Sequence, residues 1–132
     1  MTTKSDVIET KNGRFWLEDG ILRCIVAQGN VQTLEDAQDS MRVFAKLAAG
    51  KRRPAVIVIS GVKSLSREAR TVYSNDEAGK TYSSCAIVVE GSVIARALVN
   101  FIVSVSRPPF PTRWFDTVDE ALVWVRSLPS PE

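Results

Sequence analysis

Hydroxyl and basic side chains gather in one short stretch of the sequence, between a β-branched apolar run and the start of a predicted helix. The run occupies residues 55–59, and the polar loop after it contains Ser60, Gly61, Lys63, Ser64, Ser66 and Arg67. Unpaired N–H groups at a helix start, together with hydroxyl donors and cationic side chains, can bind a phosphate or a carboxylate. The stretch therefore indicates a candidate site for a small anion.

Ser66 also has a structural interpretation, which stays open beside the first. Its hydroxyl can accept a hydrogen bond from a backbone N–H of the first helical turn, a contact worth about 1 kcal/mol. A serine nucleophile assisted by Lys63 is conceivable, but no supporting base can be read from the sequence.

The composition argues against several classes of function. The chain has 132 residues, no histidine, two cysteines and a formal net charge of +2. Without histidine it lacks the commonest general base and the commonest metal ligand, and two cysteines alone do not make a zinc site. We therefore expect no enzymatic activity, no cofactor and no metal. A net charge this small also argues against nucleic acid as a partner.

The sequence also carries signals of cellular location. It opens without a leader pattern, and no apolar run reaches the ~20 residues that span a bilayer. Cys24 and Cys85 each lie within an apolar strand pattern, which is typical of buried and unreactive thiols. We expect a cytoplasmic protein without a transmembrane segment.

Apolar alternation and β-branched runs predict strands at residues 14–18, 21–27, 55–59, 82–89 and 113–115. Asp19-Gly20 joins the first two as an antiparallel hairpin, because both positions of such a turn need positive φ. Residues 1–13 are polar and without period, so we expect a flexible N-terminal segment.

Four helices are expected between and after these strands. Thr33, with Asp36 three residues later, caps the first, whose apolar positions are Leu34, Ala37, Met41, Phe44, Ala45 and Ala48. Ser66 begins the second, residues 92–106 form the third, and Thr117 with Glu120 caps the last. The pattern predicts one α/β domain at residues 14–128, with a single mixed, mostly parallel sheet of about five strands, an N-terminal antiparallel hairpin and four helices.

Ligands of such sheets bind at the carboxyl ends of the parallel strands. Gly91 and Ser92 follow the strand at residues 82–89, so they belong to the same edge as the polar loop. The candidate ligand-binding set is therefore Ser60, Gly61, Lys63, Ser64, Ser66, Arg67, Gly91 and Ser92.

The helix at residues 92–106 is more apolar than packing on one sheet requires. Val99 and Val103 fall in or beside its polar stripe, which includes Arg96 and Asn100. Scattered exposed valines are ordinary on a protein surface. Alternatively, Val99 and Val103, rimmed by Arg96 and Asn100, form the contact of a two-fold homodimer.

The element order, with Val-Ile-Ser-Gly-Val-Lys-Ser-Leu-Ser-Arg-Glu-Ala-Arg after the central strand, resembles the STAS domain of anti-sigma-factor antagonists. The chain is most similar to the small STAS/SEC14-like bacterial proteins, which also share Ser-Val-Ile-Ala-Arg-Ala, Pro-Pro-Phe-Pro-Thr and the ending Phe-Asp-Thr-Val-Asp-Glu-Ala-Leu-Val-Trp-Val. The resemblance covers about residues 14–128.

The resemblance implies a function as well as a fold. Members of the wider STAS family are non-enzymatic interaction modules, and some switch partners by phosphorylation of a serine at the start of the helix after the central strand. The Asp-Ser-Ser-Gly pattern of the family falls on Ser66-Arg67-Glu68-Ala69, so Arg67 occupies the phosphorylated position. The expectation is a regulatory or scaffolding domain that contacts a protein partner without this switch. The alternative is a binder of a small anionic metabolite or a lipid at the carboxyl edge of the sheet, since SEC14-like relatives bind lipids.

Overall fold

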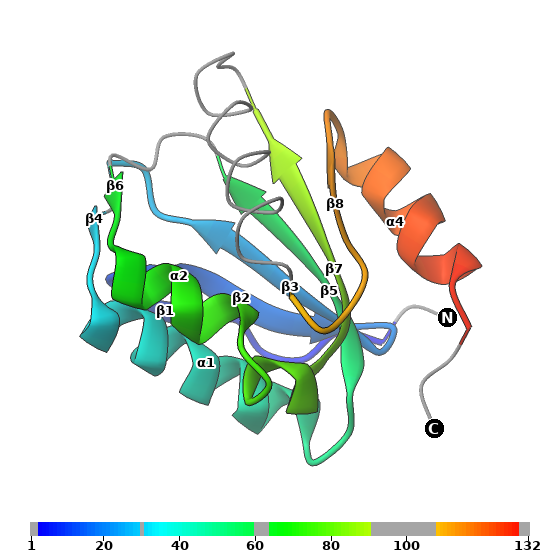
Figure 1. The fold of residues 1–132 in the computed structure, drawn as a ribbon. Coiled ribbons are helices and arrows are strands. Elements are labelled where there is room, and N and C mark those ends of the chain that lie inside the picture. The colour runs from blue at the N-terminus through cyan, green and yellow to red at the C-terminus, as the bar shows by residue number, and fades with distance from the viewer. Residues whose placement is uncertain (1–2, 30, 60–63, 91–107, 130–132) are drawn as a thin grey trace.

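The structure is a computed structural model that describes residues 3–29, 31–59, 64–90 and 108–129. Its main sheet has six strands in the order β1-β2-β3-β5-β7-β8 (Figure 1). The two N-terminal pairs, β1 with β2 and β2 with β3, are antiparallel, and the pairs from β3 to β8 are parallel. The strands are β1 (Ile8–Thr10), β2 (Gly13–Glu18), β3 (Ile21–Val26), β5 (Arg53–Ile59), β7 (Tyr82–Val89) and β8 (Thr112–Phe115).

A second, two-stranded sheet pairs β4 (Val31–Gln32) with β6 (Ser64–Leu65). The described residues also form three α-helices, α1 (Leu34–Ala48), α2 (Arg67–Ser74) and α4 (Val118–Ser127), and a short 3₁₀ turn, η1 (Ala78–Lys80). The helix predicted at residues 92–106 lies outside the described residues.

The predicted hairpin is confirmed. β2 and β3 pair from Gly13 opposite Val26 to Glu18 opposite Ile21. Asp19 has φ 53° and Gly20 has φ 78°, which is the positive-φ pair that this tight turn needs. The hairpin therefore forms the antiparallel side of an otherwise parallel sheet.

Two predictions at the N-terminal side were wrong. The sheet has six strands rather than about five, and the supposedly flexible residues 1–13 contain β1. The sequence of β1 shows no clear apolar pattern, because an edge strand is solvated on one side and does not need one. Its chain is held by an ion pair between Glu9 and Arg14 at 2.9 Å and by the N–H of Ser5, which donates to the carbonyl of Leu17 at 2.8 Å.

Alternate side chains of the central strands enter two separate cores. On β5, Ala55 and Ile57 pack on the α1 side of the sheet, whereas Val56 and Val58 pack on the α4 side. β7 repeats this alternation, which is the period of two expected of a strand that is covered on both faces. Helices therefore cover both faces of the sheet, with α1 and α2 on one side and α4 on the other (Figure 1).

Aromatic rings fill the core on the α1 side. Phe15, Phe44, Tyr82 and Phe110 form a chain of edge-to-face contacts with ring centroids 5.1 to 5.5 Å apart. Phe44 is the main contribution of α1 to this core. Two positions of the predicted apolar stripe of α1 do not take part, because Leu34 and Ala45 are exposed. Leu34 begins the helix, where α1 lies next to β4.

The two cysteines are buried and free, as their strand patterns predicted. The pairing of Cys24 with Ile57 and of Cys85 with Ala55 places the Cα atoms of the two cysteines two strands and two residues apart. That separation is roughly 12 Å, which is too long for a disulfide. Burial raises the pKa of both thiols, that of Cys85 to about 12.

We therefore expect both thiols to be unreactive in the folded protein. A thiol-specific reagent at neutral pH should label neither cysteine, because a buried thiol forms almost no thiolate. The same reagent should label both after denaturation, as counted by intact-mass spectrometry. Rapid stoichiometric labelling of Cys24 or Cys85 without denaturant would contradict the buried positions.

Candidate functional site

The pairing of β4 with β6 sets the starts of α1 and α2 side by side. Val31 pairs with Ser64 and Gln32 with Leu65, in parallel, and the N–H of Ser66 donates to the carbonyl of Gln32 at 3.0 Å. Each short strand is followed within two residues by a helix. The sequence analysis did not predict either strand, because two residues are too few for a periodic pattern.

The start of α1 is fixed by a reciprocal capping box. Thr33 Oγ1 accepts from the N–H of Asp36 at 3.2 Å, and Asp36 Oδ2 accepts from the N–H of Thr33 at 3.0 Å. The Thr33 hydroxyl also lies 3.0 Å from Asp36 Oδ2. The predicted cap is therefore confirmed, and an aspartate takes the position that glutamate usually holds.

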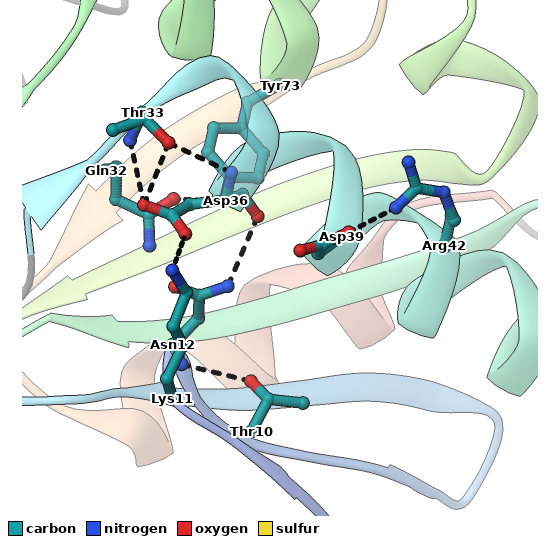
Figure 2. Close-up of polar contacts among 9 residues, drawn as sticks. All are labelled: Thr10, Lys11, Asn12, Gln32, Thr33, Asp36, Asp39, Arg42 and Tyr73. Carbon is teal, nitrogen blue, oxygen red and sulfur yellow. Dashed lines mark hydrogen bonds and ion pairs between the residues drawn. The ribbon is translucent and has the colours of Figure 1, made fainter.

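The turn between β1 and β2 packs against this capping box (Figure 2). Asn12 donates through Nδ2 to the backbone carbonyl of Asp36 at 3.3 Å, and Lys11 Nζ lies 2.8 Å from Asp36 Oδ1. The carboxylate is 5% exposed, whereas the Lys11 side chain is 75% exposed. The ion pair with Lys11 and then the hydrogen bond from the Thr33 N–H hold the pKa of Asp36 below its usual value, and Asp36 in turn raises the pKa of Lys11.

A tyrosine of α2 completes the connection between the two helices. The Tyr73 hydroxyl donates to Gln32 Oε1 at 2.6 Å, so α2 is tied to the residue that precedes the cap of α1 (Figure 2). Burial raises the pKa of Tyr73 to about 12. Tyr73 therefore fixes the arrangement of the helix starts.

Few of the predicted ligand-binding residues can be placed. Ser64 lies in β6, Ser66 caps α2 by accepting from the N–H of Ala69 at 3.0 Å, and Arg67 is the exposed first residue of α2. The remaining candidates lie outside the described residues: Ser60, Gly61, Lys63, Gly91 and Ser92 for the ligand, and Arg96, Val99, Asn100 and Val103 for self-association.

Acidic side chains lie in the first turns of both helices that begin next to β4 and β6. The side chain of Asp36 occupies the start of α1, and Glu68 lies in the first turn of α2. Both carboxylates interact favourably with the positive end of a helix dipole, as an external anion would. The described residues thus place carboxylates at both helix starts, while five of the eight predicted ligand-binding residues lie outside the part of the chain that the structure describes.

Two apolar side chains are exposed beside the start of α1. Val31 is 51% exposed and Leu34 is 41% exposed, and they flank the cap residue Thr33. We call Val31, Thr33, Leu34 and Asp36 the α1 tip. Its backbone is held by the capping box and by β6, so the two apolar side chains are presented without a large ordering cost.

Sequence reasoning missed Lys11 and Asn12 as members of this site. The two turn residues are Lys11 and Asn12, and neither has positive φ, so an Asn-Gly signal at Asn12-Gly13 would place this hairpin one residue out. Asp36 lies 24 residues along the chain from Asn12. No local sequence pattern therefore predicts the contacts of Lys11 and Asn12 with Asp36.

We expect the Ser66 hydroxyl to be structural. Ser66→Ala should lower the free energy of unfolding by about 1 kcal/mol, because the N–H of Ala69 loses its partner. Ser66→Asp should be tolerated, since an aspartate both caps the helix and favours its dipole. Urea unfolding measures both, and an unchanged midpoint for Ser66→Ala would contradict the capping role.

Among the described residues, no group of three or more cysteine, aspartate and glutamate side chains could hold a metal ion. None of the helices in the same residues is long and apolar enough to cross a membrane.

The six-stranded sheet with helices on both faces defines the class of the protein as an α/β domain with a SpoIIAA-like, that is STAS-like, fold. An uncharacterised protein of the DUF3478 family from Shewanella loihica PV-4, described as having a SpoIIAA-like fold, matches with a TM-score of 0.53. The match covers 95% of each chain at 18% sequence identity, which shows the fold alone. The chain belongs to the family described as "Domain of unknown function (DUF7793)", which it matches over residues 15–129.

A second solved structure, a protein of unknown function from Arthrobacter sp. FB24, is 29% identical over 83% of this chain and 95% of that chain. Its TM-score of 0.30 is too low to support a comparison of folds. No protein of curated function matches the chain.

Proposed function

We propose that this protein is a non-enzymatic regulatory or scaffolding domain that acts by contact with a protein partner. One observation carries the proposal: the α1 tip presents Val31 and Leu34 to solvent from a rigid backbone. Exposed apolar side chains on a rigid frame are typical of the centre of a protein interface. The STAS-like fold supports the proposal by analogy.

The proposed domain works without the phosphoserine switch of the STAS family. Arg67, at the first position of α2, stands where the family carries the phosphorylated serine. Ser66 is next to it, but its oxygen already accepts from the N–H of Ala69.

Incubation with a serine kinase of the anti-sigma-factor type should therefore leave the mass of the intact protein unchanged. Stoichiometric phosphate on Ser64 or Ser66, located by fragmentation in the mass spectrometer, would contradict this part of the proposal. Dephosphorylated STAS domains that carry the family serine provide the positive control.

The proposal is tested by affinity capture from an extract of the native cell. A Val31→Lys/Leu34→Lys variant should lose the partner that the wild type captures, because the apolar contact is replaced by charge. Val123→Lys is the matched control, since Val123 is 69% exposed on α4, on the other side of the sheet. Circular dichroism checks that all variants are folded. Equal capture by the wild type and the double variant would contradict the proposal.

The alternative function is binding of a small anionic metabolite or lipid at the carboxyl edge of the sheet. It is favoured by the position of Ser66 and Arg67 at a helix start that follows a parallel strand. A thermal-shift screen with nucleotides, phosphates and fatty acids tests it. A ligand at 100 times its dissociation constant should stabilise the fold by about 2.7 kcal/mol.

A further inference from the structure

The two oxygens of the Asp36 carboxylate have different surroundings. Oδ2 is fixed by the N–H and the hydroxyl of Thr33, both at 3.0 Å. Oδ1 faces Lys11 Nζ at 2.8 Å. The Lys11 side chain is 75% exposed, whereas the Asp36 carboxylate is only 5% exposed. The exposed lysine therefore covers the solvent-facing side of the buried carboxylate.

A second acceptor oxygen belongs to Asn12, the turn residue that contacts the backbone of Asp36. The Asn12 side chain is held against Asp36 by its Nδ2, and Asn12 as a whole is 2% exposed. Its Oδ1 is buried and makes no hydrogen bond. A buried acceptor without a donor is costly, so a donor group that reaches it would be stabilised there.

These two oxygens suit an organic cation better than a metal ion. An ammonium group offers three donors and a guanidinium group five, so either has enough donors for both Asp36 Oδ1 and Asn12 Oδ1. Calcium requires six to eight oxygen ligands, and magnesium requires a near-octahedral set. One carboxylate oxygen, Asp36 Oδ1, and one amide oxygen do not provide such a set.

We infer that Asp36 and Asn12 form a socket for a lysine or arginine side chain of the protein partner, and that Lys11 fills this socket until the partner displaces it. The inference rests on the proposed function and specifies the partner. The contacting segment carries a basic residue next to apolar residues, because the socket adjoins Val31 and Leu34 through Thr33.

The exchange of one cation for another explains how the socket can open. An ion pair with a solvent-exposed lysine contributes little to stability, so its loss is nearly compensated when a second cation takes its place. The buried carboxylate stays paired in both states, which avoids the penalty of an isolated buried charge. The apolar contacts then supply the net gain in affinity, and the socket supplies the selectivity for a basic residue.

The experiment uses ¹⁵N-labelled full-length protein and two probe peptides, acetyl-Val-Arg-Leu-amide and acetyl-Val-Gln-Leu-amide. The arginine peptide should shift the amide signals of Asn12, Thr33 and Asp36, and the glutamine peptide should bind several-fold more weakly. Lys11→Ala removes the internal competitor, so it should tighten binding of the arginine peptide about two- to fivefold. Lys46→Ala, at an exposed lysine in the last turn of α1, is the matched control and should change nothing.

Asp36→Asn should reduce binding of the arginine peptide to that of the glutamine peptide. If this variant does not fold, Asn12→Ala provides the second test, since it removes the unpartnered oxygen and should weaken only the arginine peptide. Equal affinity of wild type and Lys11→Ala, or shifts confined to other parts of the chain, would overturn the socket. Binding of a natural partner could also require Val31 and Leu34 and yet be unchanged by Lys11→Ala. That result would overturn the socket but leave the proposed function standing.

Discussion

Gly13→Ala should destabilise the protein by about 3 kcal/mol or more. A Cβ at this position would lie 2.2 Å from the carbonyl oxygen of Ile25 and 3.1 Å from Val26 Cα. Both are backbone atoms of β3, so no side-chain rotation can relieve the clash. Gly13 also has φ 149°, which L-residues rarely adopt.

Gly50→Ala is the matched control for this prediction. Gly50 also has positive φ, 80°, but a Cβ there would meet nothing within 4 Å. It should therefore cost only the backbone strain, about 1–2 kcal/mol. Urea unfolding gives both values, and similar midpoints for the two variants would show that the close approach of β2 to β3 is not rigid.

The effect of Gly13→Ala should extend to the candidate site. Gly13 follows Lys11 and Asn12, and the carbonyl of Asn12 accepts from the N–H of Ala27 at 2.9 Å. If β2 moves away from β3, the turn that contacts Asp36 moves with it. The amide signals of Thr33 and Asp36 should therefore shift in any folded fraction of this variant.

The parts of the fold that could be predicted from sequence are those with a local physical cause. Asp19-Gly20 predicts its hairpin because few residues tolerate two consecutive positive φ values. Thr33 and Asp36 predict the start of α1, and Ser66 predicts that of α2, because each cap is a contact between residues three positions apart. The parallel sheet follows from the alternation of strands and helices.

The site depends on contacts that no short window of sequence contains. β4 and β6 are two residues each and lie more than 30 positions apart, as the pairing of Val31 with Ser64 shows. The burial of Asp36 depends on the turn at Lys11 and Asn12, which β1 brings against α1. An acidic residue in a first helical turn is ordinarily exposed to solvent. The sequence alone therefore predicts an exposed Asp36, which is wrong.

Asp36→Ala should lower the free energy of unfolding by about 2 kcal/mol. The substitution leaves the N–H of Thr33 without its acceptor, removes the partner of Lys11 and breaks the capping box. Asp39→Ala is the control on the same helix, because Asp39 is exposed and pairs with Arg42 at the surface. That variant should change stability by less than about 0.5 kcal/mol.

The difference between wild type and Asp36→Ala should also depend on pH. The pKa of Asp36 is lowered in the folded state, first by Lys11 and then by the N–H of Thr33. A carboxyl of this kind stabilises the fold at pH values above its unfolded pKa, about 3.8, and the stabilisation is lost as the pH falls through the folded value. The two midpoints should therefore be well separated at pH 7 and should converge below about pH 3.8. A separation that stays constant down to pH 2 would mean that the carboxylate charge does not stabilise the cap, and the cation socket would lose its electrostatic basis.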